Sequence, residues 1–234
     1  MNIFKLLIIQ PFYNLLVFFT NLFQGHIALA VILLTILVKI ILFPLAKKAY
    51  QAQIAQKKLA PELEKIRKEF PDKQIQAQKT MELYKQTGSN PFSGCLPILI
   101  QIPIIIGIYQ VFFRGIESQV SLLYPAISTP VQVIYDFIGL NLQNKSIILA
   151  VLAGITQYLQ IHFSPAMQTP TGSVDQSDNQ AVMMASMTSS MKYTMPVVMV
   201  VIGITLPGAL ALYFVTLNIV TLLQEQILRK TVSE

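Results

Sequence analysis

A lysine lies inside a long apolar stretch of the chain, where a charge needs an explanation. Lys39 falls within residues 27–46, IALAVILLTILVKIILFPLA, and Thr35 precedes it by four positions. Residues four apart share one face of a helix, so the ammonium and the hydroxyl point the same way. A lysine at membrane depth costs about 3 kcal/mol on insertion scales and by default marks a functional site. The alternative is that its flexible stem carries the ammonium out to the lipid headgroups, since Pro44 is only five residues away.

Other polar side chains interrupt the remaining apolar stretches. They are Gln101, Gln157, Gln160, Asn218 and Thr221. Polar groups at membrane depth tend to face the interior of a helix bundle or water, so these residues would join Thr35 and Lys39 in lining a hydrophilic cavity reached from the cytoplasm. The competing explanation is hydrogen bonding between helices, worth about 0.6 kcal/mol per contact. Spacing alone leaves both explanations open.

The sequence contains no motif for covalent catalysis, nucleotide hydrolysis or metal binding. It has no Walker loop, no HExxH and no GxSxG. His26 and His162 are solitary, without the spacing of metal ligands, and are better explained as interfacial residues. The one cysteine, Cys95, cannot form an internal disulfide. We therefore expect no catalytic residue, no metal site and no cofactor, and a protein that is not an enzyme.

The composition is that of an integral membrane protein. Of its 234 residues 53% are apolar and 12% are charged, whereas soluble domains carry about 25% charged residues. This length suits one helical bundle. Ten of the 17 Lys and Arg residues lie between Pro44 and Pro91, with only five acids. The positive-inside rule places that segment in the cytoplasm, so the basic excess is mainly a topology signal.

Hydrophobic periodicity predicts an all-α integral membrane protein with five transmembrane helices, an N-terminal interfacial amphipathic helix and a cytoplasmic antiparallel helical hairpin. The interfacial helix covers residues 1–24; a cleaved signal peptide is the alternative, because Ala28-Leu29-Ala30 resembles a cleavage site. The predicted spans are residues 25–44, 95–114, 146–163, 182–206 and 208–226.

The predicted connections follow from the same pattern. They are the hairpin 45–94 with its turn at Pro71-Asp72, an extracytoplasmic loop 115–145 with a short helix over 131–142, a cytoplasmic loop 164–181 and a short cytoplasmic tail 227–234. The basic residues then predict an N-terminus outside and a C-terminus in the cytoplasm.

Several stretches resemble one known family. The most specific is SNPFSGCLPILIQIPIIIGIYQ, which contains the signature NP-x-x-GCLP-x-x-x-Q-x-P. TILVKIILFPLAKKA resembles the first shared span of that family, and KLAPELEKIRKEFPD its cytoplasmic coiled-coil loop. LAGITQYLQIHFSP and LPGALALYFVTLNIVTLLQEQ resemble its third and last spans. Over about residues 12–230 the chain thus resembles the YidC/Oxa/Alb family of membrane protein insertases.

The resemblance implies a five-span bundle in the bacterial cell membrane, with a groove open to cytoplasm and lipid but closed outward. It implies an insertase and chaperone that places short-tailed membrane proteins into the bilayer without nucleotide hydrolysis, with or beside the Sec translocon. The implied partners are nascent membrane proteins, membrane lipids, the Sec translocon and, through the hairpin, the ribosome; DNA is not among them. The implied substrate-groove residues are Lys39, Thr35, Gln101, Gln157 and Asn218.

The chain departs from the family pattern at three points. The groove arginine of the family is Lys39 here, which keeps the charge but loses the fork geometry of a guanidinium. Where the family has a tryptophan in the last span, this chain has Phe214. Where the family has a PAG turn, this chain has Pro207-Gly208-Ala209. Two other functions compete with insertion: a small-solute or ion transporter with Lys39 as counter-ion, and a scaffold that only packs other membrane helices.

Overall fold

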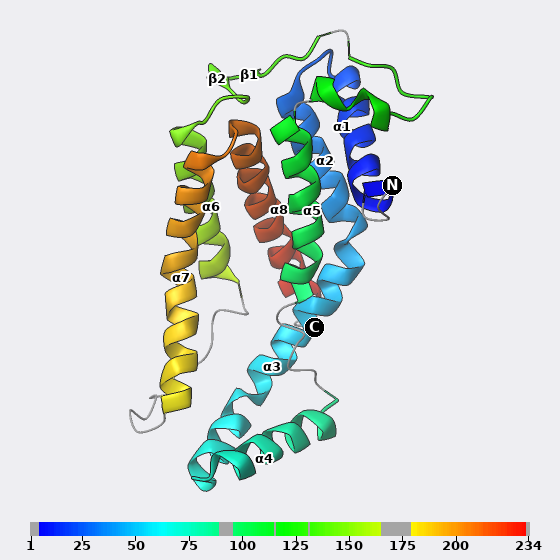
Figure 1. The fold of residues 1–234 in the computed structure, drawn as a ribbon. Helices are drawn as coiled ribbons and strands as arrows, with labels where there is room; N and C mark the ends of the chain where they lie inside the picture. The colour runs from blue at the N-terminus through cyan, green and yellow to red at the C-terminus, as the bar shows by residue number, and fades with distance from the viewer. Residues whose placement is uncertain (1–4, 89–95, 115, 131, 165–178, 233–234) are drawn as a thin grey trace.

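The computed structural model describes residues 5–88, 96–114, 116–130, 132–164 and 179–232. Residues 89–95 of the signature and most of the predicted loop 164–181 lie outside these ranges. The elements, in order, are η1 (Lys5–Ile9), α1 (Gln10–Leu22), α2 (Ile27–Ile41), α3 (Phe43–Glu69), α4 (Lys73–Gln86), α5 (Leu96–Arg114), η3 (Ile116–Leu122), β1 (Asp136–Phe137), β2 (Leu140–Asn141), α6 (Ile147–Phe163), α7 (Asn179–Thr205) and α8 (Gly208–Val232). In Figure 1 most helices stand side by side, and α3 and α4 project from one end of the bundle.

The N-terminal helix is tied into the bundle. The α1 helix packs on α2 and on the α5–η3 segment, and the buried Tyr13 hydroxyl donates to the carbonyl oxygen of Ile116 at 2.6 Å. Asn14 is buried too; its amide nitrogen donates to Leu122 O at 2.8 Å, and its amide oxygen accepts from Tyr124 N at 2.7 Å. The predicted interfacial helix therefore lies along its neighbours rather than apart from them.

A tight turn reverses the chain between α1 and α2. Gly25 has a φ of +95°, and an added Cβ would lie 2.5 Å from the carbonyl oxygen of Gln132. Both the positive φ and the close approach favour glycine. Ile134 N donates to Gly25 O of the same turn at 2.8 Å, so the segment between η3 and α6 is fastened to it.

The chain bends close to the end of the first predicted span, residues 25–44. The α2 helix ends at Ile41, and α3 leaves it at an angle of 63° after Leu42. Pro44 lies in the first turn of α3, where a missing amide hydrogen costs no helical bond. The α3 helix packs on α4 after a turn, and the Asp72 side chain caps α4 by accepting from Gln74 N at 2.7 Å.

The helices α6, α7 and α8 form the other side of the bundle (Figure 1). Gly203 of α7 lies against Ala150 of α6: an added Cβ would come within 2.8 Å of the Ala150 Cβ and 3.0 Å of its Cα. Small residues at such a crossing let two membrane helices approach closely. This contact brings α6 and α7 together beside α8.

The prediction of a short helix over residues 131–142 is wrong. The described part of this segment contains β1 and β2, which pair antiparallel with Asp136 opposite Asn141. Ile138 and Gly139, between the strands, both have positive φ, 53° and 76°. A two-residue turn with positive φ at both positions matches the twist of a β-hairpin and excludes a helix.

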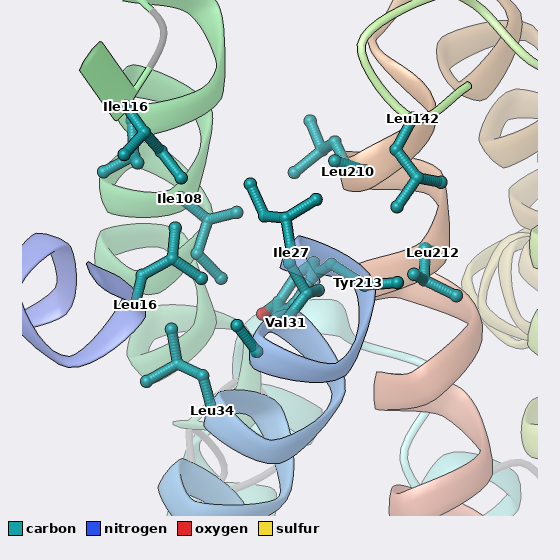
Figure 2. Close-up of a cluster of buried hydrophobic side chains, with 14 of the residues drawn as sticks. Leu16, Ile27, Val31, Leu34, Ile108, Ile116, Leu142, Leu210, Leu212 and Tyr213 are labelled. Atoms are coloured by element: carbon teal, nitrogen blue, oxygen red, sulfur yellow. The ribbon is translucent and has the colours of Figure 1, made fainter. Parts of the chain in front are cut away.

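The buried core is centred on the N-terminal half of α2. In Figure 2, Ile27 and Val31 of α2 lie between Ile108 of α5 on one side and Tyr213 of α8 on the other. Ile27 is fully buried. Because α2 packs on both α1 and α8, it joins the N-terminal helix to the side of the bundle that α6, α7 and α8 form.

The fold is an all-helical bundle of a membrane protein. Within the described residues, Lys5–Leu22 and Gly208–Val232 are long and apolar enough to cross a membrane, and the bent α2–α3 pair would make a third crossing. Shorter apolar helices are Gln101–Phe113, Ile147–Phe163 and Lys192–Thr205.

Candidate functional site

A cavity of about 130 Å³ lies below this core, between α2, the start of α3, α5 and α8. One part of its lining is apolar, with Leu34, Ile104 and Ile108 among its members. The polar lining comes from four helices and consists of Thr35, Lys39, Tyr50, Gln53, Gln101, Tyr213, Thr221, Gln224 and Glu225. The cavity thus combines an apolar wall with a cluster of hydrogen-bonding groups.

Lys39 is held to α8 by both its side chain and its backbone. Its Nζ donates to Thr221 Oγ1 at 2.6 Å, and Thr221 itself donates to Leu217 O at 2.7 Å. Lys39 lies in the last turn of α2, where carbonyl oxygens lack partners in their own helix. Gln224 Nε2 donates to the carbonyl oxygen of Lys39 at 2.8 Å. The ammonium is therefore part of the cavity lining instead of extending to lipid headgroups.

Two other predicted groove residues lie in the same cavity. Thr35 is buried and lines it, while its hydroxyl donates to Val31 O at 2.7 Å. Gln101 of α5 donates from Nε2 to the hydroxyl of the buried Tyr213 on α8. The structure thus brings Thr35, Lys39 and Gln101 together from two helices.

Asn218 and Gln157 lie outside the cavity lining. The amide nitrogen of the buried Asn218 donates to Ala153 O at 3.2 Å and to Thr156 Oγ1 at 3.1 Å, which joins α8 to α6. This is hydrogen bonding between helices, the second of the two roles considered for the polar residues. Gln157 Nε2 donates to Gln160 Oε1 at 3.3 Å on the same helix.

Glu225 is a cavity residue that the sequence reasoning missed. Its Oε1 accepts from Gln160 Nε2 and from Ser164 Oγ, both at 3.2 Å. Thr221 and Glu225 are four residues apart, so they occupy one face of α8. That spacing was the available signal, but Glu225 falls at the end of the predicted span 208–226, where an acid looks like an interfacial residue.

The cavity lining therefore includes one basic and one acidic side chain. Lys39 and Glu225 both line it, but they do not form a direct ion pair; across the described ranges the ion pair present is Lys79–Glu82, at 2.8 Å, on α4. An arrangement of this kind offers hydrogen-bonding and charged partners to a polar segment and apolar contacts to an apolar segment.

Taken together, fold and cavity define a class: a helical membrane protein with a partly polar cavity between its helices. A family model described as "60Kd inner membrane protein" matches residues 18–234, most of the chain. The chain belongs to this family, the YidC/Oxa/Alb family of membrane protein insertases.

Curated bacterial relatives agree with the family model. The chain is 33% identical to "Membrane protein insertase YidC" of Fusobacterium nucleatum, over 95% of this chain and 96% of that protein. It is 32% identical to "Membrane protein insertase YidC 2" of Listeria innocua, over 93% of this chain and 69% of that protein. It is also 31% identical to "Membrane protein insertase YidC" of Rhizobium meliloti, over 95% of this chain but only 36% of that protein.

Proposed function

We propose that the chain is a membrane protein insertase that moves nascent transmembrane segments from its cavity into the lipid bilayer. The observation that carries the proposal is the position of the Lys39 ammonium, bonded to Thr221 in a cavity shared with Thr35 and Gln101. The relatives named above are insertases, which supports the same conclusion.

The physical basis is a difference between the two parts of a substrate. The apolar segment leaves the cavity for lipid, driven by about 25 cal/mol per Å² of apolar surface removed from water. The polar or acidic tail must cross hydrocarbon, which is costly without partners. Lys39 binds that tail part-way across, and the hydroxyl and amide groups of the cavity shorten the apolar distance that remains. No covalent step or nucleotide is needed.

The proposed topology uses α2, α5, α6, α7 and α8 as five spans, with η1 and α1 in the outer half of the membrane. The helical hairpin of α3 and α4 then lies in the cytoplasm with most of the basic residues, the N-terminus lies outside and the C-terminus inside. In this orientation the hairpin meets substrate first and offers a surface to the ribosome, and the bundle works with or beside the Sec translocon in the cell membrane.

Reconstitution tests the proposed function. The purified chain is placed in liposomes with a tagged single-span substrate, and the tail that becomes protected from external protease is measured. Insertion well above that of protein-free liposomes is expected. No gain over protein-free liposomes, or uptake of small solutes without any substrate protein, would contradict the proposal.

Crosslinking tests whether the substrate passes through the cavity. A photoreactive side chain at Thr221, which lines the cavity, should capture a stalled nascent segment. The same group at Leu223, exposed on α8 and only two residues away, is the matched control. Equal capture at both positions would argue that the substrate does not pass through the cavity.

A further inference from the structure

The two carboxylate oxygens of Glu225 have unequal surroundings. Oε1 accepts hydrogen bonds from Gln160 on α6 and from Ser164, which follows the end of that helix. Oε2 is buried and has no hydrogen-bond partner among the described residues. An oxygen buried in this way loses the bonds it makes in water, so the free protein holds an acceptor that a donor would stabilise.

Glu225 lines the cavity that also holds Lys39, with Oε2 buried just behind the lining. The Lys39 ammonium is engaged with Thr221, one helical turn before Glu225 on α8. Gln160 and Ser164 brace the carboxylate from α6.

We propose that Glu225 is a specificity-determining residue which binds the ammonium or guanidinium of a lysine or arginine in a passing segment. This inference rests on the proposed insertase function and adds a substrate class to it. With Lys39 alone, the cavity would attract acidic tails and repel basic ones. With Glu225 one turn from the Lys39 contact, it accepts tails of either sign, because each sign finds its opposite.

The test compares three substrates that differ only in the translocated tail, which carries two Asp, two Asn or two Lys residues. They are inserted by the native chain and by Glu225→Gln, which keeps the size and an acceptor oxygen for Gln160 and Ser164. The control is Asp136→Asn. This substitution likewise removes one acidic group, but Asp136 is exposed and lies outside the cavity lining. Protease protection of the tail is measured for each of the three substrates with the native chain and with each variant.

We expect Glu225→Gln to lower insertion of the Lys tail about fivefold relative to the Asn tail, as expected for one charge pair at about 4 Å in water. The Asp tail should insert at least as well as before, and the control should leave all three ratios unchanged. Equal effects on all three tails, or no effect, would overturn the inference. Failure of the native chain to insert any tail would instead overturn the proposed function.

A second measurement needs no variant. A carbodiimide joins a carboxylate to an amine within reach, with loss of water, so it links a substrate lysine to the acid that binds it. Mass spectrometry of the stalled Lys-tail complex should find the tail lysine joined to Glu225. Links to other acids of the chain and none to Glu225 would overturn the inference, even if Glu225→Gln fails to fold.

Discussion

Reversing the charge at position 39 should reduce insertion of substrates with acidic tails. Lys39→Glu removes the 2.6 Å hydrogen bond to Thr221 and places a second acid in the cavity that Glu225 already lines. Thr221 keeps its bond to Leu217 O, so the local helix is preserved. The effect therefore falls mainly on the charge that an incoming carboxylate meets.

The magnitude follows from Coulomb attraction. One pair of unit charges at about 4 Å is worth about 1 kcal/mol in water and more in a partly buried site. Lys39→Gln removes one unit of charge and should slow insertion of an Asp-tailed substrate about fivefold. Lys39→Glu changes the charge by two units, which should cost at least about 2 kcal/mol. This corresponds to about a 30-fold lower insertion rate for the Asp-tailed substrate. Lys39→Arg keeps the charge and should stay near the native rate.

The assay is the initial rate of protease protection in liposomes, normalised to an Asn-tailed substrate for each variant. The normalisation separates charge from a general loss of folding. The double variant Lys39→Glu with Glu225→Lys restores one charge of each sign and should recover part of the rate. Full activity of Lys39→Glu on the acidic tail, or the same loss on the neutral tail, would refute the electrostatic role of Lys39.

Three further substitutions test the packing that positions the cavity, each by thermal unfolding in detergent. Tyr13→Phe removes the bond to Ile116 and should cost about 1 kcal/mol; an unchanged transition would mean that the bond adds nothing. Asn218→Ala should cost about 0.6 to 1.7 kcal/mol without altering the ratio of acidic to neutral insertion, and a changed ratio would place Asn218 in the substrate path. Gly203→Val should cost about 1–3 kcal/mol by overpacking against α6, whereas Ile202→Val, on an exposed position of the same helix, should cost less; equal losses would contradict the close contact.

Helical periodicity could predict the part of the site that lies on one helix. Thr35 and Lys39 share a face because of their spacing, and both line the cavity. Gln101 could be placed with them only through the family signature, because nothing in the spacing of one helix tells which face meets another. For the same reason Asn218, which bonds α6, was not separable from a cavity residue.

Features that depend on tertiary contacts could not be predicted from the sequence. The oxygens of Glu225 are braced by Gln160 and Ser164, more than sixty residues earlier in the chain. The sequence did not predict the bend after α2, because Pro44 is equally compatible with the end of one helix and the first turn of the next. Between β1 and β2, the residue type at position 138 did not predict a positive φ, because β-branched residues such as Ile138 rarely adopt one.

The clamp between Gln224 and the carbonyl of Lys39 has a mechanical consequence. It holds Lys39, two residues before α2 ends at Ile41, while the arm formed by α3 and α4 begins beyond Leu42. Because the start of α3 also packs on α5 and α8, the part of the arm beyond these contacts is the part that can tilt without displacing Lys39. In the proposed insertase this division would keep the charge that binds the tail in place while the hairpin receives a client.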